Sequence, residues 1–338
     1  MTMKPSLFAK ACLAASLALA AATASARAQE SEYGPADATE TYYWVSNMSN
    51  LPLFVAYDYK GLKAAADELG VKVRVAGPTA FDLAAFIATV DQVCAQSPAG
   101  VSVVGWDPSL TEPVNNCLAN GVPTVTDDAD LPDSDRLSFI GTDWGAIGVA
   151  QAKAMIENLP DGGKVALLSI INADNMIAAR KGFKAYLDAK APGKFEVVAE
   201  EDDAADSAQA AAKTAALLAA YPDLAGIAGF DAESGAGIVS ALREGGKQPG
   251  DIVVTAMEQS VDFYNTVKEG YVQAIIVQNR ELFTYYAIKM LYDYNHNGLK
   301  TVGLSAADGG RPIPPRVDTG LLVVNRENVD KIVAALSK

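Results

Sequence analysis

Short apolar segments alternate with helical patterns along most of the chain, and this alternation constrains the fold more than any other feature. The predicted strands are rich in Val and Ile and are often apolar at consecutive positions, which is typical of strands covered by helices on both faces. They are 42–46, 71–76, 101–105, 124–126, 165–169, 196–199, 226–229, 252–256 and 274–277. Repeated strand–helix–strand units predict an α/β fold with parallel sheets.

The length of 338 residues favours two domains over one, because single cores stop growing at about 250–300 residues. We predict two doubly wound, Rossmann-like parallel-sheet lobes joined by a hinge of several strands. The first lobe is expected to contain residues 40–141 and 280–310, and the second residues 142–279 and 311–338. Repeated crossing between lobes forms a hinge that can close on a ligand.

The first 28 residues are predicted to be a signal peptide. Lys4 and Lys10 give a positive start, residues 11–22 are apolar, and Ala26-Arg27-Ala28 has the small-x-small pattern of a cleavage site. A membrane anchor is the alternative, but the apolar run is shorter than the roughly 20 residues that a spanning helix needs. We therefore expect cleavage near Ala28, export to the periplasm and no membrane insertion afterwards.

The charge balance excludes some partners. The chain has 41 acidic and 27 basic residues, giving a formal net charge of −14. Such a surface repels phosphate backbones and anionic lipid, so nucleic acid is not an expected partner.

Two cysteines of the expected mature chain invite a disulfide in an oxidising compartment. Cys94 and Cys117 fall late in two consecutive predicted helices with one strand between them. The helices would then be neighbours on one sheet face. We predict a bond between these cysteines, with two buried thiols as the alternative.

Ligands of open parallel sheets bind outside the carboxyl ends of the strands. Carboxylates, amides and aromatic residues follow the predicted strands in both lobes. Carboxylates accept hydrogen bonds from hydroxyl groups, amides donate and accept, and an aromatic ring covers the C–H face of a sugar. We predict a site for a small neutral sugar or polyol, with candidates Ser46, Asn50, Phe54, Trp106, Asp107, Asp128, Asn175, Asp231, Glu258 and Gln278.

Five motifs, in order along nearly the whole mature chain, resemble the type I periplasmic sugar-binding proteins of the ribose-binding group. They are the loop 46–54 with its Asn-x-Pro-x-Phe ending, the Gly-x-Pro strand and aspartate of 121–128, the crossover 141–148, and the segments 222–231 and 270–279. The resemblance implies a solute receptor of an ABC transporter. It implies that Asn50 and Asp128 bond ligand hydroxyls and that Phe54 stacks on the ring.

In the second lobe the resemblance assigns ligand contacts to Asp231 and Glu258, and to Gln278 in the hinge. The chain also departs from the family pattern. Ala129 stands where an arginine often follows Asp128, and Arg180 is only a possible substitute for a second arginine of the family. Together with the longer Glu258, these departures indicate a ligand other than ribose in its usual pose.

Several candidates have a structural alternative. Phe54 also fits a place in the core, and Asp128 and Asp143 fit turn or helix caps. Trp106 and Trp144 fit either a ligand-stacking role or the contact between lobes. The pair Asp202-Asp203 is interpreted as a solvated charge run.

The sequence favours a receptor over an enzyme. The chain has one histidine, His296, and no His/Cys set with zinc spacing. No G-x-G-x-x-G motif follows a strand and no P-loop motif is present, so we expect no metal or cofactor. Asp231 and Glu258 leave a glycoside-acting enzyme as a remote alternative.

Two receptor roles remain open. An importer subunit would deliver its ligand to a membrane ABC permease, and a periplasmic sensor would present it to a membrane signalling protein. A lactose-repressor-type regulator would carry a basic helix-turn-helix, whereas this chain carries an export signal. We expect a monomer.

Overall fold

The computed structural model describes residues 32–257, 259–296 and 312–336. Three expectations therefore lie outside the described residues in whole or in part: the signal peptide 1–28, the ligand contact of Glu258, and the end of the 280–310 segment. Among the helices described, none is both long enough and apolar enough to cross a membrane.

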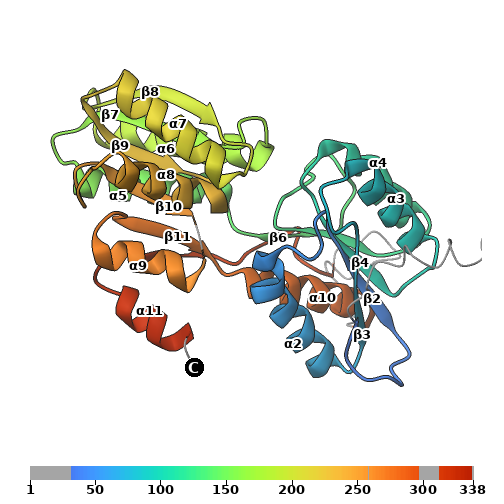
Figure 1. The fold of residues 1–338 in the computed structure, drawn as a ribbon. Helices are drawn as coiled ribbons and strands as arrows, with labels where there is room; N and C mark the ends of the chain where they lie inside the picture. The colour runs from blue at the N-terminus through green and yellow to red at the C-terminus, as the bar shows by residue number, and fades with distance from the viewer. Residues whose placement is uncertain (1–31, 258, 297–311, 337–338) are drawn as a thin grey trace, which may run out of the picture.

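The first lobe, which carries β2, β3 and β4 in Figure 1, is built on a seven-stranded sheet in the order β1-β3-β2-β4-β5-β6-β12. The sheet is parallel apart from the edge strand β1. Its strands are β1 (Glu32–Tyr33), β2 (Thr41–Val45), β3 (Lys72–Ala76), β4 (Gly100–Val104), β5 (Thr124–Asp127), β6 (Phe139–Gly141) and β12 (Arg316–Asp318). Helices α2 (Tyr59–Leu69) and α10 (Arg280–His296) share one core cluster with the sheet, and α3 (Leu83–Cys94) and α4 (Thr111–Ala119) share another.

The strands of this lobe are apolar at consecutive positions because both faces are covered. In β2, Tyr42 and Trp44 pack toward α2 and α10, whereas Tyr43 and Val45 pack toward α3 and α4. All four side chains are buried. Helices on both faces of the sheet therefore explain the run of consecutive apolar residues, as the sequence predicted.

The second lobe repeats this architecture on a six-stranded sheet in the order β13-β11-β10-β9-β7-β8, with only β13 antiparallel. Its strands are β7 (Gly163–Ser169), β8 (Phe195–Asp202), β9 (Leu224–Gly229), β10 (Val253–Met257), β11 (Ala274–Gln278) and β13 (Leu321–Val324). One face carries α5 (Trp144–Asn158) and α6 (Asp174–Lys190); the other carries α7 (Ser207–Ala220), α8 (Ala232–Glu244), α9 (Val261–Glu269) and α11 (Val329–Leu336). The predicted two-lobe α/β fold is confirmed.

The chain passes between the lobes after β6, after β11 and after β12, and the crossings are bonded to one another. Thr142 Oγ1 donates to the carbonyl oxygen of Gly320 at 3.1 Å. The backbone N–H of Thr319 donates to the carbonyl oxygen of Gly141 at 2.9 Å. The side-chain Nδ2 of Asn279 donates to the carbonyl oxygen of Thr319 at 2.8 Å. These side-by-side crossings form the hinge.

The third crossing lies later than expected. The sequence predicts that residues 311–338 belong to the second lobe, but β12 pairs in parallel with β6 of the first sheet. Only after residue 318 does the chain enter the second sheet as β13. A strand of three residues directly after Pro314-Pro315 carries too little periodicity to be recognised in the sequence.

The predicted disulfide is confirmed. Cys94 ends α3, Cys117 lies in α4, and the two Sγ atoms are bonded across a Cα–Cα distance of 5.3 Å. Both cysteines belong to the core cluster under these helices. The bond therefore fixes two neighbouring helices on the same face of the first sheet.

Candidate functional site

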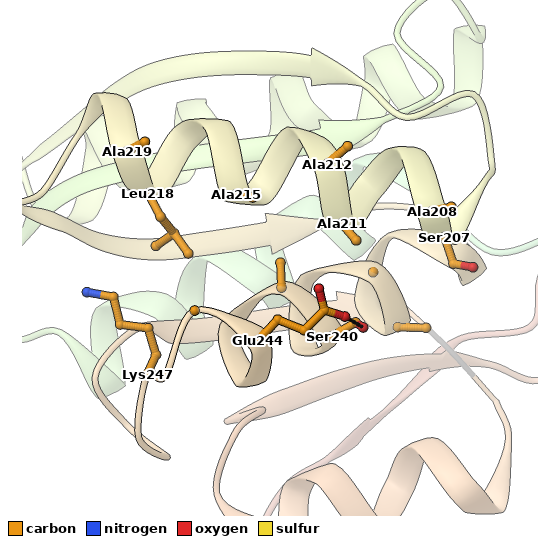
Figure 2. A pocket seen from close by; sticks show the side chains of 14 residues that line it. Ser207, Ala208, Ala211, Ala212, Ala215, Leu218, Ala219, Ser240, Glu244 and Lys247 are labelled. Atoms are coloured by element: carbon orange, nitrogen blue, oxygen red, sulfur yellow. Dashed lines mark hydrogen bonds between the residues drawn. The ribbon is translucent and has the colours of Figure 1, made fainter.

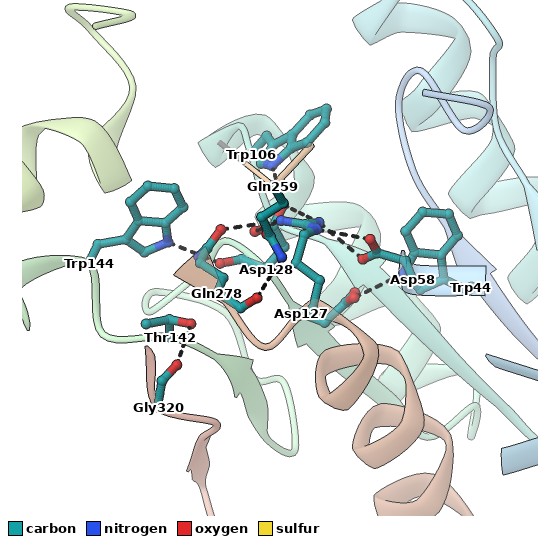
Figure 3. A network of polar contacts seen from close by, with 11 residues as sticks. Trp44, Asp58, Trp106, Asp127, Asp128, Thr142, Trp144, Gln259, Gln278 and Gly320 are labelled. Carbon is teal, nitrogen blue, oxygen red and sulfur yellow. Dashed lines mark hydrogen bonds and ion pairs between the residues drawn. The ribbon is translucent and has the colours of Figure 1, made fainter. Parts of the chain in front are cut away.

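A buried ion network lies where the first lobe meets the hinge (Figure 3). Arg280, the first residue of α10, bonds Asp58 through Nε and Nη2 at 2.9 and 3.0 Å. The same guanidinium bonds both carboxylate oxygens of Asp128 at 3.1 and 3.2 Å. All three side chains are almost inaccessible to solvent. One cation is thus held between two carboxylates by paired, charge-assisted hydrogen bonds.

Local backbone geometry delivers both carboxylates. Asp58 ends a π-helical turn, Phe54–Asp58, between β2 and α2. Such turns are rare and concentrate at functional sites. Asp128 follows β5 with φ at 62°, in the left-handed region that costs energy for most residues but that Asp tolerates. Its carbonyl oxygen accepts from Trp144 Nε1 at 3.1 Å, which ties the first lobe to the helix after the first crossing.

The aromatic residues of the loop after β2 are part of this network. The Arg280 guanidinium lies 5.1 Å from the Phe54 ring centre, and the Trp106 ring lies 5.6 Å from it. Phe54 is 1% exposed, so it takes the core position named as its alternative and has almost no surface for a ligand. Trp106 is half-buried and donates from Nε1 to Asp128 at 3.2 Å. Trp106 is therefore the better placed of the two aromatic residues to cover a ligand.

A third carboxyl lies next to this network. Asp127 is fully buried and accepts hydrogen bonds from Trp44 Nε1 at 2.9 Å and Ser102 Oγ at 3.0 Å. Burial, with the charges of Asp58 and Asp128, raises the pKa of Asp127 to about 7. Burial also raises the pKa of Asp58, although the charge of Arg280 opposes that rise.

The second lobe contributes Asp231 directly after β9. Asp231 caps α8: its Oδ1 accepts the backbone N–H groups of Glu233 and Ser234 at 3.0 and 2.8 Å. Its Oδ2 is buried and has no hydrogen-bond donor among the described residues. Asp231 thus combines the capping role that Asp often has with a free buried acceptor.

Gln278 ends β11 at the second crossing. Its Oε1 lies 3.4 Å from Arg280 Nη1, and its carbonyl oxygen accepts from Gln259 Nε2 at 2.8 Å. Its Nε2 is buried and has no acceptor in the described part of the chain. Strands β9 and β11 lie on either side of β10 in the sheet. The unpaired acceptor Asp231 Oδ2, after β9, and the unpaired donor Gln278 Nε2, at the end of β11, therefore lie two strands apart at the same edge of the sheet.

Three candidates of the first lobe make no hydrogen bond to this network among the described residues. Asn50 is exposed in the loop after β2. Ser46 is buried and donates from Oγ to the Asn47 carbonyl oxygen at 2.8 Å. Asp107 caps a short 3₁₀ turn through the Ser109 amide at 2.9 Å.

Two candidates of the second lobe lie on α6. Asn175 is half-buried in its first turn. Arg180 pairs with Glu200 at 2.9 Å and also bonds the Ile171 carbonyl oxygen at 2.7 Å and Ser169 Oγ. Arg180 is therefore paired within its own lobe, with a carboxylate that also binds Lys184.

Sequence reasoning missed Asp58, Arg280 and Asp203. Arg280 lies two residues after Gln278, which the sequence places in the hinge, and this position is the signal that could have identified it. Asp58 depends on a π-helical turn, which sequence periodicity does not reveal. The interpretation of Asp202-Asp203 as solvated is wrong for Asp203, which is fully buried, and right for Asp202, which is exposed.

A groove of about 1060 Å³ lies between α7 and α8 (Figure 2). Small side chains line it, among them Ala208, Ala211, Ala212, Ala215 and Ala219. Gly237 allows the helices to approach closely, because a Cβ there would lie 2.4 Å from the Ser207 carbonyl oxygen. The groove follows from this packing and lacks the converging buried polar groups of the hinge site. Within the described ranges, no group of three or more His, Cys, Asp or Glu residues could hold a metal ion.

Comparison with known proteins agrees with this architecture. A family model described as a periplasmic binding protein domain matches residues 42–298. The ribose import binding protein of Salmonella typhimurium is 27% identical over 245 residues, which cover 71% of this chain and 80% of the relative.

Among solved structures, the sugar-binding protein of a sugar ABC transporter from Bacillus halodurans is 31% identical with a TM-score of 0.80, covering 86% of this chain and 99% of that one. The arabinose binding protein of Geobacillus stearothermophilus is 28% identical with a TM-score of 0.75, covering 86% and 98%. The resemblance seen in the sequence motifs is confirmed: the chain belongs to the periplasmic binding protein domain family, as one of the type I periplasmic sugar-binding proteins.

Proposed function

We propose that this protein captures one small neutral sugar or polyol between its lobes in the periplasm, after signal cleavage near Ala28, and delivers it as a monomer to the permease of an ABC importer. The family and the names of its relatives support sugar binding and transport. The proposed role is capture and release without chemical conversion.

One observation carries the proposal. Oδ2 of Asp231 and Nε2 of Gln278 are a buried acceptor and a buried donor without partners among the described residues. A buried polar group left unsatisfied costs about 1–3 kcal/mol. Sugar hydroxyls donate and accept, so two hydroxyl groups of one ligand satisfy both atoms. Asp128 and Trp106 supply the opposing surface from the first lobe.

The charge of the site favours a neutral ligand. Arg280 is held by Asp58 and Asp128. Arg180 pairs with Glu200, which also binds the partly exposed Lys184. Neither cation is left to neutralise a phosphate or carboxylate on the ligand, and an unpaired buried charge is costly. Aldopentoses, hexoses and alditols fit this lining, whereas phosphosugars and sugar acids do not.

The proposed mechanism is closure at the three bonded crossings. A ligand shifts the population toward a closed state only through extra contacts made there. Asp231 and Gln278 come from the second lobe and its hinge end, and Asp128 and Trp106 from the first. A sugar bonded to both sets therefore stabilises the closed arrangement, whose outline a permease can recognise.

Thermal-shift screening against neutral sugars and polyols is expected to identify a ligand, because binding to the native state raises the melting temperature. With that ligand, Asp231→Ala should weaken binding about ten- to a hundredfold in calorimetry, as one charged hydrogen bond is worth about 1.5–3 kcal/mol. Asp143→Ala is the matched control, since Asp143 also caps a helix but its side chain is about half exposed.

Equal affinity in the Asp231→Ala and Asp143→Ala proteins would reject the assigned site. Turnover of the bound compound would contradict a binding role. Deleting the gene distinguishes the two receptor roles, because loss of growth on the ligand indicates import and loss of gene induction alone indicates sensing.

A further inference from the structure

Asp203 is a second carboxyl behind the sugar-facing acid of the second lobe. It directly follows β8, is fully buried, and lies close enough to Asp231 for the charge of that carboxylate to act on it. Ser234 connects the two acids: its amide donates to Asp231 Oδ1 at 2.8 Å, and its Oγ donates to Asp203 Oδ2 at 2.5 Å. The backbone N–H of Asp203 donates to the Ser169 carbonyl oxygen at 3.3 Å, which fixes the acid to the end of β7.

No cation balances this pair among the described residues. From α8 the pair is faced by Glu233, and Asp206 caps the neighbouring helix α7. Arg180 of α6 reaches only Ser169 Oγ in this region, and it pairs with Glu200. Two adjacent ionised carboxylates in such surroundings are unfavourable, and one proton on the pair relieves the repulsion.

We propose that Asp203 is a positioning residue of the sugar site: the pair keeps one proton, on Asp203, and Asp203 holds Oδ2 of Asp231 in place to accept a hydrogen bond from a ligand hydroxyl. The inference rests on the proposed function. It adds a residue that the family motifs did not assign, and it makes binding depend on the protonation of a carboxyl pair.

The pair has a defined pH range. Burial is the main cause that raises the pKa of Asp203 to about 7, and the neighbouring Asp231 carboxylate adds to this rise. Below this pH Asp203 keeps its proton. Above it Asp203 becomes ionised beside Asp231, and a ligand that covers the pair must desolvate an additional charge. Sugar affinity is therefore highest below about pH 7 and falls as the pH rises through it.

The first test needs no ligand. Because the folded state holds the proton more tightly than the unfolded state, wild-type stability falls as the pH rises from about 4, the ordinary pKa of Asp, to about 7. Asp203→Asn keeps an acceptor for Ser234 and is permanently neutral beside Asp231, so this variant should lose less stability over that range. Asp206→Asn, which keeps a helix cap, should retain the wild-type profile. A parallel profile in Asp203→Asn and wild type would overturn the proton kept on Asp203.

The second test uses the sugar or polyol found by screening, with its Kd measured between pH 6 and pH 9. Wild-type and Asp206→Asn proteins should lose about three- to tenfold in affinity over this range, whereas Asp203→Asn should show an almost flat profile. Asp203→Ala should bind about tenfold more weakly at pH 6. A merely structural Asp203 would change stability but leave the pH dependence of Kd as in wild type, and that result overturns the assignment. A failure of every compound to bind would instead reject the proposed function.

Discussion

Arg280→Ala is expected to lower the free energy of unfolding by about 3–5 kcal/mol, the largest effect of any single change considered for this chain. The substitution leaves Asp58 and Asp128 buried, close together and without their cation. Breaking a buried pair is costly because the remaining charge keeps its desolvation penalty. The loss also removes the cation from the Phe54 and Phe283 rings. Urea denaturation of the ligand-free protein measures the change.

Arg243→Ala is the matched control for this experiment. Arg243 pairs with Glu269 and lies over the Tyr271 ring, but its side chain and that of Glu269 are each about half exposed. Exposed pairs contribute about 0–1 kcal/mol, so this variant should unfold nearly as wild type does. A loss in Arg280→Ala no larger than in Arg243→Ala would show that the network does not stabilise the first lobe.

Gly61→Ala is expected to destabilise the protein by about 3 kcal/mol, near the upper end of the usual cost of overpacking. A Cβ at Gly61 would lie 2.1 Å from the Glu281 carbonyl oxygen and 2.3 Å from Thr284 Oγ1. The methyl group must therefore push α2 away from α10. Asp58 immediately precedes α2, Arg280 begins α10, and Thr284 Oγ1 donates to the Asp58 carbonyl oxygen at 2.6 Å. The displacement consequently disturbs the ion network together with the helix packing.

Gly145→Ala provides the control for a glycine-to-alanine change in a helix. The nearest atom to a Cβ at Gly145 is Asp143 Oδ1 at 3.1 Å, and no backbone atom obstructs it. Alanine favours helix over glycine by about 0.5–1 kcal/mol, so this variant should be neutral or slightly more stable. If Gly61→Ala behaves like Gly145→Ala in the same denaturation assay, the close approach of α2 and α10 does not set the geometry of the network.

Most of the fold could be predicted because its signals are local. The apolar runs of strands such as 71–76 and 101–105 indicate that they are buried. The position of Gly70 likewise predicts the end of α2, and Gly70 has a positive φ there. The third crossing could not be located, because pairing of β12 with β6 joins residues about 175 positions apart and leaves no periodic pattern. Long-range pairing of a short strand is decided by the tertiary structure.

The candidate site was predicted in part. Asp128, Asp231 and Gln278 are candidates because they follow strands, and the structure places each at the carboxyl end of a strand; their contact with a ligand stays a prediction. The sequence could not show that the charge of Asp128 is matched from 152 residues away, by Arg280. Nor could it show that Phe54 is covered by the same guanidinium. Residues that act through distant partners are recognised only once the fold brings them together.

The central claim is that the two lobes close on a neutral ligand, and a distance between them tests it most directly. Val55 and Ile177 are exposed on the first turns after β2 and β7, at the carboxyl-end edges of the two sheets. In a chain beginning at Gln29, the remaining cysteines, Cys94 and Cys117, are bonded to each other. Spin labels on Val55→Cys/Ile177→Cys then report the interlobe distance by pulsed electron paramagnetic resonance. Saturation with the neutral sugar or polyol found by screening should shorten this distance by several ångströms, whereas an unchanged distance at saturation would contradict closure.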